Sequence, residues 1–272
     1  MTSRRIESFV GHGALILGAL IALYPFVSIV RHALGPAAGS NAAGPFTLEN
    51  FTRAWVGGGF SHSLVSSAIV AVGVVVVTGA IASLAGYAMA MLDVPWRGAI
   101  MGVLLIGLVL PAEARIVPLY DMFEGWGLLN TYWAIILPQI ASSFSLSTMW
   151  MTTYYSALPK ELTESAAVDG ANSWKAFTRI VFPLGSSALA TLSCLIFLYT
   201  WNEFLLALVL LPQNPAVQTA PLSLSFFAGA ERNTQPEVIA AAAVLVALPV
   251  VIAYAFLQRR FIQGLTEGAV KG

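Results

Sequence analysis

Charged residues are scarce in this sequence, and their scarcity excludes most soluble folds. Asp, Glu, Lys and Arg make up 10% of the 272 residues, whereas 58% are hydrophobic. An average soluble domain has about 25% charged residues. Basic and acidic residues are equal in number, 13 of each, so the sequence lacks the basic excess that indicates nucleic-acid binding. The composition therefore indicates an integral membrane protein surrounded by lipid.

Cysteine is nearly absent, which excludes an internal disulfide and a cysteine-based metal site. The single Cys194 lies in an apolar segment, where its small side chain suits helix packing. His12, His32 and His62 are dispersed and are interpreted as ordinary residues near the ends of apolar segments. No lysine stands in the pattern G-x-x-x-x-G-K-[ST], which binds nucleotide phosphates. We therefore expect no catalytic residue, metal or nucleotide on this chain.

Apolar segments long enough to cross a bilayer recur along the sequence. A spanning helix needs about 20 mostly apolar residues, and backbone amides in lipid must be bonded within their own segment. The segments lack the period-2 alternation of barrel strands. The sequence therefore predicts an all-α integral membrane fold with six transmembrane helices. The expected spans are Phe9–Val30, Ser63–Leu92, Ala99–Val117, Tyr132–Met151, Leu184–Leu211 and Val238–Leu257.

The distribution of Lys and Arg predicts the orientation, because these residues are enriched in cytoplasmic loops. A cytoplasmic N-terminus puts nine of the 13 basic residues inside and four outside, so both termini are expected in the cytoplasm. A cleaved signal peptide would also begin with basic residues, but the first apolar run is too long for one. The inside residues are Arg4, Arg5, Arg97, Lys160, Lys175, Arg179, Arg259, Arg260 and Lys271, and the outside residues are Arg31, Arg53, Arg115 and Arg232.

The polar segment 160–183, between the fourth and fifth expected spans, has the residues of two short helices joined by a bend. Pro159 suits the first position of a helix, and Gly170 suits a helix end with positive φ. Asn172 or Ser173 can cap the second helix. An amphipathic hairpin lying on the membrane would fit the same pattern. The second helix is expected to carry an apolar stripe of Trp174, Phe177 and Val181.

The same segment resembles the EAA signature of ABC importer permeases, E-A-A-x3-G-x9-I-x-L-P. Five positions match at the same spacing, and two carry a small or apolar replacement. The matches are Glu164, Ala166, Gly170, Ile180 and Pro183, and the replacements are Ser165 and Phe182. The resemblance implies a coupling loop that docks on a separate ATPase subunit, which would bind the ATP and Mg. The residues implied at this contact are Glu164, Ser165, Ala166, Asp169, Gly170, Trp174 and Phe177.

Residues 63–272 resemble the carbohydrate-type importer permeases, and in particular their smaller maltose-permease class. The most specific match is the C-terminal Gly264–Gly272. The resemblance implies a type I permease fold in the cytoplasmic (inner) membrane of a prokaryote. It also implies a second, non-identical permease, two ATPase subunits and an extracytoplasmic solute-binding protein. The expected parts are 1–62 (tail, first span and outer loop), 63–257 (core permease) and 258–272 (cytoplasmic tail).

Two further groups of polar residues are candidate contacts. Trp201, Asn202 and Glu203 could line the transport pathway or the interface with the second permease. The outer loop before the last span is implied to contact the binding protein, through Gln213, Asn214 and Gln218.

The sequence leaves other functions and several solutes open. An ion-coupled carrier would place acidic groups within its spans, and Glu203 is the main candidate for such a group. A membrane scaffold or enzyme would transport nothing. Oligosaccharides, amino sugars and glycerol phosphate all remain possible solutes at this point.

Overall fold

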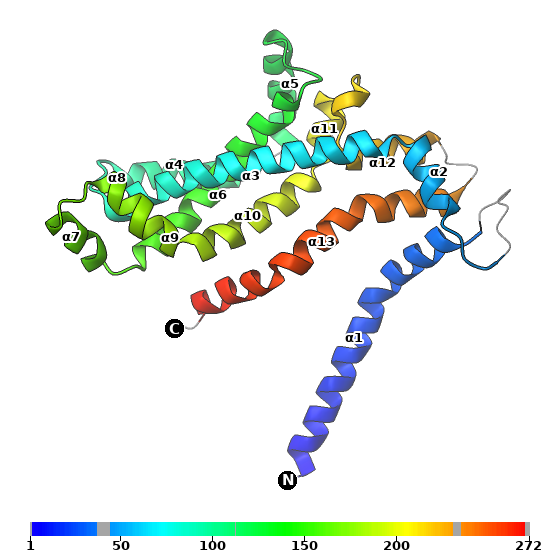
Figure 1. Ribbon diagram of the computed structural model, residues 1–272, viewed down its shortest axis with the longest axis horizontal. Coiled ribbons are helices and arrows are strands. Elements are labelled where there is room, and N and C mark those ends of the chain that lie inside the picture. The colour runs from blue at the N-terminus through cyan, green and yellow to red at the C-terminus, as the bar shows by residue number, and fades with distance from the viewer. Residues whose placement is uncertain (1, 37–43, 112, 231–234, 270–272) are drawn as a thin grey trace. The chain divides into compact units, whose positions relative to one another are not determined.

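The computed structural model describes residues 2–36, 44–111, 113–230 and 235–269, with side chains described from Gly11 to Phe256 within these ranges (Figure 1). Every regular element in these ranges is a helix, so the all-α prediction is confirmed. The side chains of the expected C-terminal tail and Arg232 lie outside the described residues. The chain forms two compact units, Met1–Ser61 with Ser223–Leu248 and His62–Leu222 with Pro249–Gly272.

The first unit contains α1 (Thr2–Leu34) and α2 (Glu49–Gly57), together with parts of α12 (Ala220–Ala230) and α13 (Pro236–Ala269). Asn50 joins α1 to α2. Its buried Nδ2 donates to the carbonyl oxygens of Ala33, at 2.9 Å, and Gly35, at 2.7 Å. The last carbonyls of a helix have no partner within the helix, and the Asn50 amide supplies one here.

The second unit is built around α3 (Phe60–Met91), α6 (Tyr132–Ser156) and α10 (Ser186–Trp201). A Cβ added at Gly86 of α3 would lie 2.6 Å from the Cβ of Met151, so the two helix backbones are in close contact there. The hydroxyls of Ser83 and Tyr155 form a buried hydrogen bond of 2.6 Å between α3 and α6. The other elements are α4 (Arg97–Val109), η1 (Glu113–Arg115), α5 (Ile116–Gly125), α7 (Glu161–Val168), α8 (Ser173–Ala176), η2 (Phe177–Val181), α9 (Phe182–Leu184), α11 (Leu205–Leu210) and η3 (Pro215–Val217).

Three helical segments among the described residues are long and apolar enough to cross a membrane. They are Gly11–Leu34, Phe60–Met91 and Pro236–Phe256, and they match the first, second and sixth expected spans. Counting each of two bent helix pairs as one span raises the number to five. The fourth expected span forms the single 25-residue helix α6, which carries several polar side chains. The count of six spans therefore stays a prediction.

The third expected span is not one continuous helix, so that part of the prediction is wrong. Helix α4 ends at Val109, and Leu110 is extended, with φ −67° and ψ 119°. The residue before a proline is sterically driven out of the helical conformation, and Leu110 precedes Pro111. The chain resumes as η1 and then α5.

The fifth expected span is broken as well. Helix α10 ends at Trp201, and α11 begins only at Leu205. The Asn202 side chain donates to the Leu198 carbonyl at 2.8 Å, and the Glu203 carboxylate accepts the Leu206 N–H at 2.8 Å. Such side-chain bonds to the backbone compete with a continuing helix. At its other end, α10 is bent by 70° from the segment Ser173–Leu184.

Candidate functional site

The signature loop, residues 160–183, has the predicted helix–bend–helix shape. Helix α7 ends at Val168, and Gly170 adopts φ +77°. The Asn172 side chain caps α8 by accepting the Lys175 N–H at 2.9 Å. The expectation that Pro159 is the first helical residue is wrong. Helix α7 begins at Glu161, and the Pro159 carbonyl accepts the Leu162 N–H from outside the helix.

The second half of the signature loop is fixed to helix α3 by aromatic contacts. Phe177 is 5% exposed, and its ring centroid lies 5.1 Å from that of Tyr87 on α3. The rings of Trp174 and Phe182 lie 5.8 and 5.6 Å from Phe177. The Tyr87 hydroxyl also donates to the Ser173 carbonyl at 3.1 Å. The packed rings and this hydrogen bond therefore join the second half of the loop directly to α3.

Both helices of the signature loop expose apolar side chains. Val168 is 89% exposed, Trp174 61% and Leu162 38%. Exposed apolar patches often mark interaction surfaces, and these three residues lie in one short segment of the chain. These three residues are called the apolar tip below.

The residues predicted at the ATPase contact fall into two groups. Ala166 and Phe177 are buried within the chain itself, at 8% and 5% exposure. The sequence reasoning missed Leu162 and Val168. A helical projection of Glu161–Val168 separates Val168 from the face that buries Ala166, but it places Leu162 on that same face, one turn before Ala166. The exposed members of the predicted set are Glu164, Ser165, Asp169, Gly170 and Trp174.

Two of the residues predicted at the binding-protein contact have internal hydrogen bonds. The Asn214 side chain donates to the Asn130 carbonyl at 3.1 Å, and the Gln218 side chain donates to the Pro212 carbonyl at 3.3 Å. Gln213 is exposed, and its backbone N–H donates to Asn130 Oδ1 at 2.9 Å. These bonds shape the outer segment around Asn130, which has φ +59°. Asparagine is enriched at positive φ, and this was the available sequence signal for Asn130.

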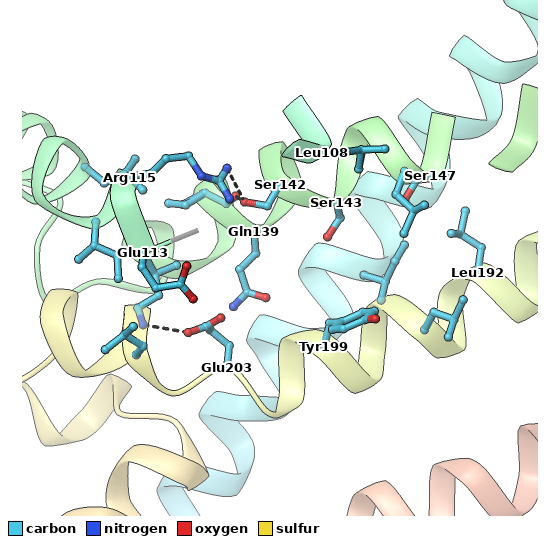
Figure 2. A pocket seen from close by; sticks show the side chains of 18 residues that line it. Leu108, Glu113, Arg115, Gln139, Ser142, Ser143, Ser147, Leu192, Tyr199 and Glu203 are labelled. Carbon is cyan, nitrogen blue, oxygen red and sulfur yellow. Dashed lines mark hydrogen bonds between the residues drawn. The ribbon is translucent and has the colours of Figure 1, made fainter. Parts of the chain in front are cut away.

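The tripeptide Trp201–Glu203 lies at the break between α10 and α11. Trp201 is 4% exposed and packs on Phe197, with ring centroids 5.5 Å apart. Glu203 lines a cavity of about 330 Å³ within the second unit, whereas Trp201 and Asn202 do not line it. Figure 2 shows this cavity, to which the chain contributes residues from both helix breaks. Its polar lining consists of Glu113, Arg115, Gln139, Ser142, Ser143, Ser147, Tyr199 and Glu203.

These features define an α-helical membrane protein with an exposed signature loop and a partly open cavity that has several polar residues in its lining. Residues 79–267 match the model of the family described as "Binding-protein-dependent transport system inner membrane component". The chain belongs to this family, and the family resemblance expected from its sequence is confirmed.

Relatives of known function are similar over the whole chain. The trehalose transport system permease protein SugB of Mycobacterium tuberculosis is 30% identical, with 100% of each chain covered. The trehalose/maltose transport system permease protein MalG of Thermococcus litoralis is 33% identical, with 94% of each chain covered. In fold, the chain is similar to a chain in the crystal structure of a bacterial ABC transporter involved in the import of the acidic polysaccharide alginate. That match has a TM-score of 0.80 at 23% identity and covers 96% of this chain and 98% of the other.

Proposed function

We propose that this chain is a permease subunit of an ATP-driven, binding-protein-dependent importer of di- or oligosaccharides. The observation that carries the proposal is the signature loop, whose geometry and apolar tip suit docking on a partner, in a chain of this family. Several relatives are named for the transport of trehalose, maltose, arabinooligosaccharides or raffinose. Among the solutes left open by the sequence, these names favour oligosaccharides.

The assembly proposed for this chain contains a second, non-identical permease, two ATPase subunits and an extracytoplasmic solute-binding protein. The ATPase subunits bind the ATP and Mg and contact the apolar tip. Exposed Gln213 remains the best candidate for the binding-protein contact. Both termini and the signature loop lie in the cytoplasm in this proposal, because the basic residues are enriched on that side.

The proposed mechanism is alternating access without covalent chemistry on this chain. ATP binding closes the ATPase dimer and displaces α7 and α8. The packed rings of Phe177 and Tyr87 pass this displacement to α3, and α3 contacts α6 closely at Gly86. Interlocked helices move as rigid bodies rather than deforming continuously, so the change at the loop reaches the spans.

The test is uptake by the reconstituted assembly in liposomes. We expect uptake of radiolabelled trehalose, maltose or raffinose that requires ATP, the ATPase subunits and the binding protein. The control uses the same liposomes with ATP supplied only on the side of the membrane that lacks the ATPase subunits. This control should show background uptake. Uptake driven by a proton or sodium gradient with this permease alone would contradict the proposal and favour an ion-coupled carrier.

A further inference from the structure

The cavity lies where two interrupted helices meet. One interruption separates α4 from η1 and contributes Glu113 and Arg115, and the other separates α10 from α11 and contributes Glu203. Irregular backbone at membrane depth is tolerated where it is buried in protein or lines a cavity. In secondary transporters, solute sites are often formed by such discontinuous helices. The volume of about 330 Å³ is within the range of about 300–1,000 Å³ for small-molecule sites.

The cavity contains buried hydrogen-bond donors without partners among the described residues. Gln139 is 8% exposed, and its Nε2 has no hydrogen-bond partner there. Arg115 Nη1 donates to Ser142 Oγ at 3.1 Å, but Arg115 Nε is buried and likewise unpartnered. An unsatisfied buried donor costs about 1–3 kcal/mol, and a ligand that accepts hydrogen bonds would remove this cost. Figure 2 shows the Gln139 carboxamide and the Glu203 carboxylate directed into the same space.

The charges of the lining disfavour an anionic ligand. Glu113 and Glu203 are acidic and Arg115 is the single basic residue of the lining, so its formal charge is negative. A phosphate or carboxylate would therefore be repelled, whereas a sugar hydroxyl can accept from an amide or guanidinium and donate to a carboxylate. Tyr199 adds an aromatic surface to the lining, which suits the C–H face of a sugar ring.

We infer that this chain itself holds a sugar subsite in the cavity, selective for uncharged sugar units over phosphorylated or carboxylated ones. Gln139 and Arg115 donate to the sugar hydroxyls, and Glu203 accepts from them. Glu203 Oε1 also accepts the Leu206 N–H, which fixes the carboxylate at the start of α11. The inference rests on the proposed function and deepens it, because it places solute contacts on this permease and names the class of solute.

The experiment is thiol protection in the complete assembly in lipid nanodiscs. Gln139→Cys is made in a Cys194→Ala background, which removes the single native thiol. A polar methanethiosulfonate reagent is applied with trehalose, maltose or raffinose, or with glycerol 3-phosphate, during ATP turnover with the binding protein. We expect at least one of the neutral sugars to slow the labelling about fivefold or more, and glycerol 3-phosphate to leave it unchanged.

Matched variants separate a subsite from indirect effects. Ser143→Cys, at a second lining position, should show the same protection and covers the case in which Gln139→Cys does not fold. Ala141→Cys lies on the same helix but is exposed outside the lining, and its labelling should not respond to sugar.

Three outcomes would overturn the inference. One is the absence of protection in an assembly that takes up the sugar, and another is equal protection by glycerol 3-phosphate. The third is a lack of labelling at both lining positions in every state, which would mean that the partner permease fills the cavity. Wild-type uptake is measured in parallel, because a wild-type assembly without ATP-driven uptake of the sugars contradicts the proposed function itself.

Discussion

Val168→Glu is expected to lower sugar-stimulated ATP hydrolysis by the assembly about tenfold or more. Val168 is 89% exposed at the end of α7, and the proposal places it against the ATPase subunit. A carboxylate there must be desolvated without a partner on docking, and a tenfold loss corresponds to only about 1.4 kcal/mol. Losses of about 2 kcal/mol or more are common at the centre of an interface. The measurement is ATP hydrolysis with and without sugar-loaded binding protein.

Because Val168 is exposed, its substitution should change docking on the ATPase subunit without changing the stability of the permease. Exposed substitutions change the free energy of unfolding by about 0.5 kcal/mol or less, so thermal unfolding of the purified permease should match wild type. Val168→Ile keeps the apolar surface and should retain most of the hydrolysis. Full hydrolysis and uptake by Val168→Glu would show that the apolar tip is not the docking surface.

Phe177→Ala should both destabilise the permease and uncouple it. The buried ring contacts Tyr87, Trp174 and Phe182, and truncation of a buried Phe to Ala costs about 3–5 kcal/mol. The loop would remain at the ATPase surface but lose its packed contact with α3. We therefore expect a lower unfolding temperature in detergent and fewer sugar molecules transported per ATP hydrolysed.

Tyr87→Phe is the matched control for this link. It removes the hydrogen bond to the Ser173 carbonyl but keeps the ring contact with Phe177. A single hydrogen bond contributes about 0.5–1.5 kcal/mol, so the loss of stability should be smaller and the transport ratio close to wild type. Unfolding of Phe177→Ala at the wild-type temperature, with the wild-type number of sugar molecules transported per ATP hydrolysed, would contradict the proposed link between the signature loop and α3.

Local chemistry made the signature loop predictable. The positive φ of Gly170 and the cap at Asn172 depend only on neighbouring residues, and both are present in the structure. The long apolar helices followed from length and hydropathy in the same way. The family followed from the spacing of the signature, which is also a local property of the sequence.

The helix breaks and the cavity depend on interactions that the sequence pattern does not show. Pro111 is evident in the sequence, but apolar residues lie on both sides of it. The expected third span therefore continued through this proline. The contact between Tyr87 and Phe177 joins residues about one third of the chain apart. Gln139 belongs to no motif in the sequence, and its burial in the lining of the cavity could be found only from the tertiary structure.

Cross-linking at Val168 tests the central claim, that the apolar tip is the surface through which a partner's ATP hydrolysis acts. Val168→Cys in the Cys194→Ala background is treated with a short photoreactive thiol reagent in the complete assembly. We expect a cross-link to the ATPase subunit, with a yield that differs between the nucleotide-free and ATP-bound states. A thiol that reacts freely with a soluble reagent and forms no cross-link to the ATPase subunit in either state would contradict it.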